Sequence, residues 1–289
     1  MTSDDEIRSL VRQRAGRPER ITEAALARRR PVAWGEQRLM IIAADHPARG
    51  SIGVRDKPDA MASRIDLLHR LRTALSRPGV HGVVGTADIV EDLLLMGELD
   101  DRLVIGSMNR GGLTGTVFEL DDRFTGYDAR TIADMGFDGG KMLCRIDPGD
   151  PGTASTLEAC GKAVTELARG RMMAMVEPLP VRRIDGKAQL DTDPGALIRA
   201  IGVGQALGAT SAYTWLKLPV VEDMDRVLEA TTLPVLLLGG DSAGEQAYAG
   251  WQKALTNPGV RGLVVGRALL YPPDDDVAAA VDAAAAMVR

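Results

Sequence analysis

The amino-acid sequence predicts an α/β fold, a (β/α)8 TIM barrel with an N-terminal helical extension. Eight short apolar runs alternate along the chain with helical segments of similar length. The runs lack the alternation of apolar and polar residues that marks a one-sided sheet, which indicates parallel strands buried on both faces. Eight such units in about 250 residues fit the size of this barrel. A doubly wound open sheet is the structural alternative.

Each predicted strand is a short apolar run that ends near a glycine, a proline or a polar residue. In chain order the eight runs are 39–44, 80–85, 102–106, 137–146, 172–177, 213–219, 233–240 and 261–266. Helical segments follow several of them, at 59–76, 87–96, 153–169, 194–207 and 277–288. The sixth run is rich in aromatic and β-branched residues, and strand alternation places Trp215 and Lys217 on one face of it.

The chain divides into an N-terminal helical extension, residues 1–37, and a catalytic barrel domain, residues 38–289. The first 37 residues mix arginines with acidic residues and have scattered helical periodicity. This mixture favours a solvated extension that covers one end of the barrel over a nucleic-acid-binding tail. One connection, 109–128, is long and contains several glycines, which is typical of a binding lid or an interface loop.

The composition argues against several classes of partner. A formal net charge of -5 and an aromatic content of 3% disfavour a nucleic-acid-binding protein. The sequence has no run of 18 apolar residues that would predict a membrane span, and its start does not resemble a signal peptide. We therefore expect a cytoplasmic protein that binds neither nucleic acid nor membrane.

Cysteine and histidine are scarce in this chain. Cys144 and Cys160 are expected to be small buried residues, because two cysteines make neither a disulfide framework nor a metal cluster. Of the three histidines, only His46 follows a predicted strand directly. A catalytic zinc site usually needs several imidazoles, so no metal is expected, and lysines and carboxylates must carry most of any catalysis.

Four charged residues lie at the carboxyl ends of predicted strands, where barrels of this type place their active sites. They are Asp45, Lys141, Glu177 and Lys217. Lys141 and Glu177 are 36 residues apart, and Glu177 and Lys217 are 40 apart, each about one βα unit. Lys217 alone could simply reach solvent, but such charges gathered in one barrel mouth are costly unless they pair.

This cluster has the groups needed for imine chemistry. Two neighbouring lysines disfavour each other's charge, so one of them is expected to supply a neutral amine that attacks a ketone. Glu177 is placed to move protons during imine formation, and Asp45 to take the proton of a substrate hydroxyl. Because an imine accepts electrons, the expected reaction is aldol cleavage through a covalent lysine imine, without a cofactor.

The last two strands end in residues that suit a phosphate group. Backbone amides at Gly239 and Gly240, the Ser242 hydroxyl, and the Gly266-Arg267 pair meet where this fold often binds phosphate. The guanidinium of Arg267 would add charge to the hydrogen bonds.

Six short motifs, in register around the barrel, resemble those of the class I (Schiff-base) aldolases, including the fructose-bisphosphate, tagatose-bisphosphate and sulfofructose-phosphate enzymes. They are Ala43-Ala-Asp45, Lys141-Met-Leu-Cys144, Val176-Glu-Pro178, Leu216-Lys217, Gly239-Gly-Asp-Ser242 and Gly266-Arg-Ala-Leu269. The resemblance implies a carbon–carbon lyase that forms or cleaves a ketose phosphate, releases dihydroxyacetone phosphate, and assembles as a homo-oligomer. It implies Lys217 as the imine lysine, with Lys141 assisting cleavage and holding a substrate hydroxyl.

The chain departs from the animal enzymes of this family at the far end of the substrate. It has Ser107-Met-Asn-Arg110 where they carry a lysine, and it does not end in tyrosine. We expect Arg49, Arg55, Asn109 or Arg110 to hold that end instead. The arginines favour a sugar phosphate with an acidic or shorter aldehyde half, for example a deoxy-keto-gluconate phosphate in sugar or inositol catabolism.

Two other functions stay open from the sequence. One is a barrel enzyme with different imine chemistry, such as a deoxyribose-phosphate aldolase or a transaldolase. The other is a non-catalytic barrel that binds sugar phosphates.

Overall fold

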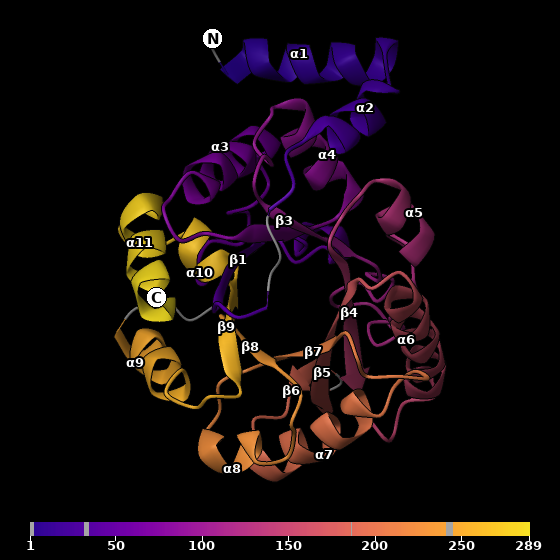
Figure 1. Cartoon of the computed structure of the whole chain (residues 1–289). Helices are drawn as coiled ribbons and strands as arrows, with labels where there is room; N and C mark the ends of the chain where they lie inside the picture. The colour runs from indigo at the N-terminus through magenta and orange to yellow at the C-terminus, as the bar shows by residue number, and fades with distance from the viewer. Residues whose placement is uncertain (1–2, 32–34, 186, 241–244) are drawn as a thin grey trace.

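The computed structural model describes residues 3–31, 35–185, 187–240 and 245–289, and its centre is a closed barrel of parallel strands (Figure 1). The order of neighbouring strands is β4-β3-β2-β1-β9-β8-β7-β5, and pairing of β4 with β5 closes the ring. In these residues eight parallel strands therefore form a TIM barrel, which confirms the predicted fold class. The strands are β1 Leu39–Ala43, β2 Gly82–Gly85, β3 Leu103–Ser107, β4 Gly139–Ile146, β5 Met173–Ile184, β7 Thr214–Leu218, β8 Val235–Leu238 and β9 Val260–Val265.

Helices surround the barrel, as the alternating sequence pattern predicts (Figure 1). The closing helix, α11, spans Val277–Val288, as expected, and most other predicted helices agree to within a few residues. The full set is α1 Ser3–Gly16, α2 Arg20–Ala27, α3 Arg64–Leu75, α4 Ala87–Leu95, α5 Ala129–Asp134, α6 Gly152–Arg169, α7 Pro194–Gln205, α8 Met224–Leu228, α9 Glu245–Ala254, α10 Arg267–Leu270 and α11, with a short 3-10 turn at Pro47–Arg49. No helix in the described ranges is long and apolar enough to cross a membrane.

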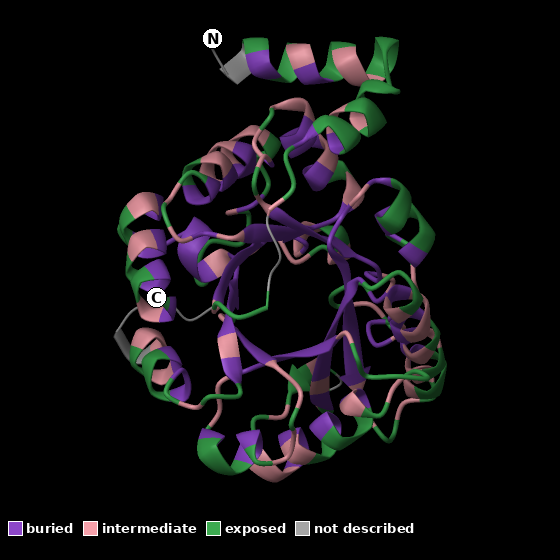
Figure 2. Cartoon of the chain, viewed as in Figure 1, coloured by how far each residue is buried: buried purple, intermediate pink, exposed green. Residues whose placement is uncertain are grey.

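The barrel strands have two buried faces (Figure 2). Alternate residues point inward and form an inner apolar cluster that includes Ile41, Met175 and Trp215. The residues between them, such as Ile42, Val176 and Leu216, pack outward against the helices. Strand alternation then turns the next inward positions toward the barrel mouth. Lys217 follows Trp215 in this inner row, as the sequence predicts.

One strand pair was missed by the sequence analysis. Strand β5 does not stop at Glu177 but continues to Ile184, beyond the barrel, and pairs in antiparallel fashion with β6, Lys187–Leu190. The prediction ended the fifth strand at residue 177 because Pro178 and Pro180 follow it. The resulting β5–β6 hairpin stands beside the mouth of the barrel.

The N-terminal helices lie beside the barrel, against α4, and not over one of its ends as expected (Figure 1). Arg14 on α1 explains the contact: it pairs with Glu91 and Asp92 and donates to the carbonyl of Asp88. A second contact joins Glu6 to His69 Nε2 of α3 at 2.6 Å. The arginine and acidic residues of this extension therefore form specific ion pairs with the barrel's helices.

A buried ion pair joins the N-terminal extension to the amino ends of β3 and β4. The Arg28 guanidinium pairs with Asp138 at 3.2 Å and donates to the carbonyl groups of Arg102 and Gly136. Asp138 also accepts from the backbone amide of Val104 at 2.9 Å. We expect Arg28→Ala to lower the free energy of unfolding by about 3 kcal/mol, because it removes the buried charge partner of Asp138 and leaves that carboxylate only the more distant and largely exposed Arg30.

Urea unfolding of the full chain measures this effect, and Arg29→Ala is the matched control. Arg29 pairs with Asp100 and Asp101, but its side chain is 68% exposed. Removing an exposed pair is expected to cost less than about 1 kcal/mol. Equal losses for the two variants would contradict the structural role of Arg28.

Candidate active site

A cavity of about 280 Å³ opens at the carboxyl ends of the barrel strands. This is the face where TIM barrels carry their active sites. The cavity brings together most of the residues singled out from the sequence, from elements far apart in the chain. Those that line it are His46, Arg49, Arg110, Glu177, Lys217, Gly239, Gly240, Gly266 and Arg267.

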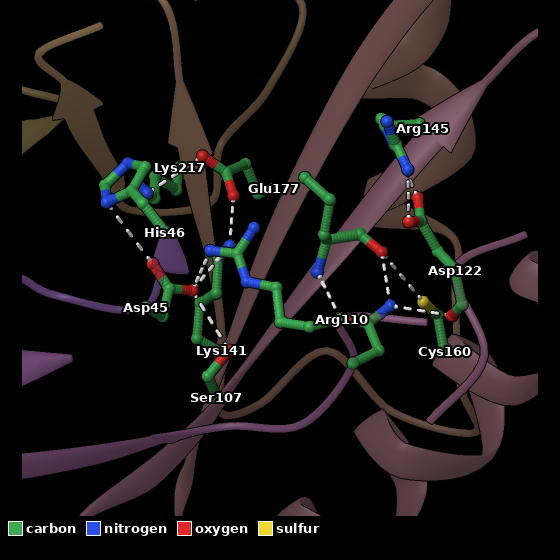
Figure 3. A network of polar contacts seen from close by, with 12 residues as sticks. Asp45, His46, Ser107, Arg110, Asp122, Lys141, Arg145, Cys160, Glu177 and Lys217 are labelled. Atoms are coloured by element: carbon green, nitrogen blue, oxygen red, sulfur yellow. Dashed lines mark hydrogen bonds and ion pairs between the residues drawn. The ribbon is translucent and has the colours of Figure 1, made fainter. Parts of the chain in front are cut away.

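A chain of alternating charges lies below this cavity (Figure 3). Glu177 is its centre: Oε1 accepts from Lys217 Nζ at 2.8 Å, and Oε2 pairs with Lys141 Nζ. Lys141 Nζ also contacts Asp45 Oδ2 at 3.3 Å, and Arg110 pairs with the same oxygen. The five side chains come from five strands or the loops that follow them, and each charge has an opposite neighbour.

The two carboxylates of this chain stay ionised. Burial alone would raise the pKa of Glu177, but the ammonium groups of Lys141 and Lys217 outweigh it and hold that pKa well below its ordinary value. At Asp45, burial is likewise outweighed by Arg110 and Lys141, so its pKa is also lowered. Both groups are therefore proton acceptors around neutral pH.

Lys141 differs from the sequence-based expectation in the cause of its shifted pKa. Burial is the largest cause, followed by the charge of Arg110, and together they lower the pKa of Lys141 to about 8. The charge of Lys217 lowers this pKa further but has a smaller effect, and Glu177 contacts both ammonium groups. The sequence predicted that the two lysines shift each other's pKa; for Lys141, burial and Arg110 have the larger effects.

Only one of the two lysines reaches the cavity. Lys217 lines it and is 4% exposed, whereas Lys141 is completely buried and is not part of its wall. The strands explain this difference, since Lys141 pairs with Met175 in register, one inward position below Glu177. A substrate carbonyl can therefore approach Lys217 but not Lys141 in this structure.

Asp45 also lies behind the cavity wall. Its side chain is fully buried, it accepts a hydrogen bond from the Ser107 hydroxyl at 3.0 Å, and it does not line the cavity. Direct contact with a substrate hydroxyl, as expected from the sequence, does not fit this position. The neighbouring His46 lines the cavity, and its Nδ1 lies 4.0 Å from Asp45 Oδ1.

His46 is held neutral in this wall. Burial lowers the pKa of its imidazole well below the ordinary value; Asp45 acts in the opposite direction, and the nearby cations lower the pKa further. Of the other histidines, His69 contacts Glu6, and His81 Nδ1 accepts from the Met40 amide at 2.9 Å. His46 is thus the histidine at the strand ends, as predicted.

The ends of β8 and β9 form the opposite wall. Gly239, Gly240, Gly266 and Arg267 all line the cavity there. Gly240 has a φ of 60°, a left-handed conformation that glycine adopts without strain and that turns the backbone at this point. Arg267 donates to the Ser51 hydroxyl at 3.4 Å. Ser242, which was also assigned to a phosphate site, lies outside the described residues.

Of the four residues expected to hold the far end of the substrate, two line the cavity and two do not. Arg49 and Arg110 line the cavity, but Asn109 does not. Both ends of the Asn109 side chain hold backbone: its nitrogen donates to the carbonyls of Asp122 and Leu143, and its oxygen accepts from the Leu143 amide. Asn109 therefore fixes the loop against β4 and is not available to a substrate. Arg55 lies outside the cavity and donates to the carbonyl of Tyr271.

Two features of this end were missed by the sequence analysis. Arg145, an inward residue of β4, lines the cavity and pairs with Asp122 of the long loop at 2.8 Å. The alternation from Lys141 to Arg145 was the available signal. The other feature is β6, whose residues 188–190 form the outer wall of the cavity. Nothing in the polar sequence of β6 distinguishes it from an ordinary loop.

The loop at 109–128 is packed at both ends, whereas its middle is exposed, with Val117 97% exposed. Besides the Asp122–Arg145 pair, the Glu119 carbonyl accepts from Arg145. Gly112 allows this approach, because a Cβ at that position would overlap the Glu119 carbonyl oxygen. This loop therefore supports one wall of the cavity.

Cys144 and Cys160 are buried free thiols away from the cavity wall, as expected. Within the described ranges, no group of three or more His, Cys, Asp or Glu side chains is arranged to hold a metal ion. The titratable side chains that line the cavity are one lysine, four arginines, one histidine and one carboxylate.

The fold and the position of this cluster define an aldolase-like TIM barrel. The fold is similar to that of the class I fructose-bisphosphate aldolases. The chain belongs to the Cgl0159-like family, whose profile matches residues 37–285. No curated protein sequence matches it.

Three solved structures have a similar fold. The crystal structure of Cgl0159 from Corynebacterium glutamicum is 51% identical, covers 98% of this chain and 97% of its own, and has a TM-score of 0.96. An archaeal fructose-1,6-bisphosphate aldolase, with its catalytic lysine bound to a carbinolamine intermediate, is 20% identical over 93% of this chain and 99% of its own, with a TM-score of 0.66. The fructose-bisphosphate aldolase of Slackia heliotrinireducens is 15% identical over 100% of this chain and 91% of its own, with a TM-score of 0.66.

Proposed function

We propose that the protein is a Schiff-base aldolase, a carbon–carbon lyase that cleaves or forms a ketose phosphate through an imine on Lys217. Dihydroxyacetone phosphate is the ketone product, and the other product is an aldehyde. The observation that carries this proposal is the Glu177 carboxylate, which contacts Lys217 at the cavity and Lys141 below it. A buried lysine paired with a proton acceptor is the arrangement that imine formation requires.

Imine formation uses the Lys217–Glu177 pair. Glu177 Oε1, 2.8 Å away, takes a proton from the Lys217 ammonium group, and the free amine adds to the ketone carbon. Glu177 then gives the proton to the carbinolamine hydroxyl, which leaves as water, and the iminium ion remains. Lys141 holds Glu177 ionised and in place, and acts through it.

Carbon–carbon cleavage needs a second base. A base removes the proton from the substrate hydroxyl, the aldehyde leaves, and the electrons of the broken bond move toward the iminium nitrogen to give an enamine. We assign this step to the β1 end of the cavity, where neutral His46 lines the wall with Asp45 behind it. Protonation of the enamine and addition of water then release the ketone and restore Lys217.

The phosphate of the ketone half is assigned to the wall formed by β8 and β9. Gly239 and Gly240 offer backbone at a tight turn, and the Arg267 guanidinium adds a positive charge. Charge-assisted hydrogen bonds from arginine suit a phosphate group. Lys217, on the adjacent strand β7, is then one strand away from the bound phosphate.

Borohydride trapping tests the proposed imine. Incubation with dihydroxyacetone phosphate and borohydride is expected to reduce the imine to a stable secondary amine on Lys217, which peptide mass spectrometry locates. Trapping with acetaldehyde, but not with the ketone phosphate, would instead favour deoxyribose-phosphate aldolase chemistry. Absence of an adduct with every ketose or ketone phosphate supplied would remove the imine mechanism and leave a non-catalytic sugar-phosphate-binding barrel.

A further inference from the structure

A second cationic wall faces the proposed phosphate site across the cavity. It is formed by Arg49, which follows β1, Arg110, which follows β3, and Arg145 on β4. In the strand order, β3 and β4, which carry or precede Arg110 and Arg145, lie on the other side of the ring from β8 and β9. Arg49 follows β1, the neighbour of β9, but its guanidinium donates to Thr114 in the loop after β3 and so belongs to the group of Arg110 and Arg145. The mechanism above uses the phosphate wall and the floor of the cavity, and assigns no role to this group of arginines.

Two of these arginines already have carboxylate partners. Arg145 makes a two-point contact with Asp122, which is fully buried, and Arg110 pairs with Asp45 (Figure 3). Their charges are therefore largely compensated within the protein. Arg110 and Arg145 line the cavity, but their carboxylate partners make them less available to a ligand than Arg49.

Arg49 has no such partner. Its guanidinium donates to the Thr114 hydroxyl at 3.3 Å, and in the described part of the chain no carboxylate lies within 4.0 Å of it. Burial, followed by the charges of Arg145 and Arg110, lowers the pKa of Arg49 to about 10. A half-buried guanidinium beside two other arginines is costly unless an anion joins it.

The surroundings of Arg49 fix its place without neutralising it. Its backbone carbonyl accepts from the Thr114 amide at 3.0 Å, so the 109–128 loop holds this turn. Opposite, the wall formed by β6 contributes Gln189 and Leu190, which carry no charge. Asp122 and Glu119 act on Arg49 from a distance, but an anion entering here would still meet Arg49 as a guanidinium with no ion pair of its own among the described residues.

We propose that Arg49 binds a second anionic group of the substrate, so that the aldehyde half carries a phosphate or a carboxylate. The assignment of this group to the aldehyde half rests on the proposed aldolase function. A guanidinium offers a planar pair of donors that matches either anion. The substrate then spans the cavity with one anion at each wall and its reacting carbons above Lys217.

Acceptor discrimination in the condensation direction tests the chemical class. With dihydroxyacetone phosphate as donor, kcat/KM is measured for two matched pairs of acceptors: glyceraldehyde 3-phosphate against glyceraldehyde, and glyoxylate against glycolaldehyde. The charged acceptor is expected to be preferred in at least one pair. Arg49→Gln should reduce that preference by roughly 10- to 100-fold, the range expected for a charge-assisted pair. The pair with the larger preference distinguishes phosphate from carboxylate.

Arg123→Gln is the matched control, because Arg123 lies in the 109–128 loop that contacts Arg49, pairs with Asp121 and has a side chain that is 78% exposed. It should retain the wild-type preference. A preference that survives Arg49→Gln, or that falls equally in Arg123→Gln, would overturn the proposal.

Phosphate binding tests the site independently of turnover. Calorimetric titration with inorganic phosphate should find two sites in the wild-type protein and one in each of Arg49→Gln and Arg267→Gln. Two sites remaining in Arg49→Gln would exclude Arg49 as an anion-binding residue. Failure of borohydride trapping alone would remove the aldolase function but would leave this result standing.

Discussion

Lys217→Arg is expected to abolish turnover, with kcat lower by about 10⁴-fold or more, as when a covalent nucleophile is lost. A guanidinium keeps the positive charge next to Glu177 but cannot form an imine. The borohydride adduct should disappear with the activity. Steady-state kinetics on a ketose phosphate substrate and mass spectrometry of the trapped protein measure the two effects on one preparation.

The matched control for this variant is Lys253→Arg, an exposed position on α9. It should retain wild-type kinetics and the adduct. Thermal unfolding of both variants separates loss of chemistry from loss of fold, since Lys217 is part of a buried charge chain. Full turnover by Lys217→Arg in a folded protein would be incompatible with an imine at this position.

Much of the fold follows from the sequence because the barrel strands have two buried faces. Runs such as 39–44 and 262–266 carry no polar side chain, and in a chain of this length that pattern fits few architectures. The β5–β6 hairpin escaped prediction since β6 is polar and its partner segment contains Pro178 and Pro180. The pairing of β6 depends on where β5 lies in the folded protein, and the pattern of residues within β6 does not give that position.

The candidate site was predictable to the level of strand ends and no further. Placing Lys141, Glu177 and Lys217 together required only the barrel and the βα spacing. The sequence did not predict that Glu177 lies between the two lysines. Its position depends on how far up the barrel each of the three side chains lies, which spacing along the chain does not give. The predicted effect of Lys217 on the pKa of Lys141 has the expected direction, but burial and Arg110 are the larger causes.

Loop residues were the least predictable part. Asn109 and Arg110 are adjacent in the chain, yet one holds backbone and the other pairs with Asp45. The direction of each side chain is set by the packing of the 109–128 loop against β4, through Asp122 and Arg145. An asparagine or arginine can bind a substrate or can hold a loop in place, and spacing along the sequence does not distinguish these two roles.

The charge chain has an energetic consequence for the mechanism. Lys141 and Asp45 are fully buried, and each would be costly alone. Glu177 connects them to Lys217, so the carboxylate that moves protons is also the one that compensates two ammonium groups. Loss of its charge should therefore affect both chemistry and stability, and an experiment must separate the two.

Glu177→Gln is expected to lower kcat by roughly 10²- to 10⁴-fold, the usual contribution of a general acid–base group. The amide is nearly the same size but can neither accept the Lys217 proton nor deliver it to the carbinolamine. The borohydride adduct on Lys217 should still form on long incubation, at a lower rate, because the amine itself remains. Single-turnover trapping over time measures this rate directly.

Glu222→Gln is the matched control, since Glu222 is an exposed residue in the connection that follows β7. It should leave both kcat and the trapping rate at wild-type values. If Glu177→Gln instead trapped dihydroxyacetone phosphate at the wild-type rate but lost turnover, Glu177 would act after imine formation. If it kept full turnover, Glu177 would serve only to balance the charges of the two lysines. The predicted result, slow imine formation in a folded protein, distinguishes proton transfer from charge balance because only proton transfer limits the trapping step.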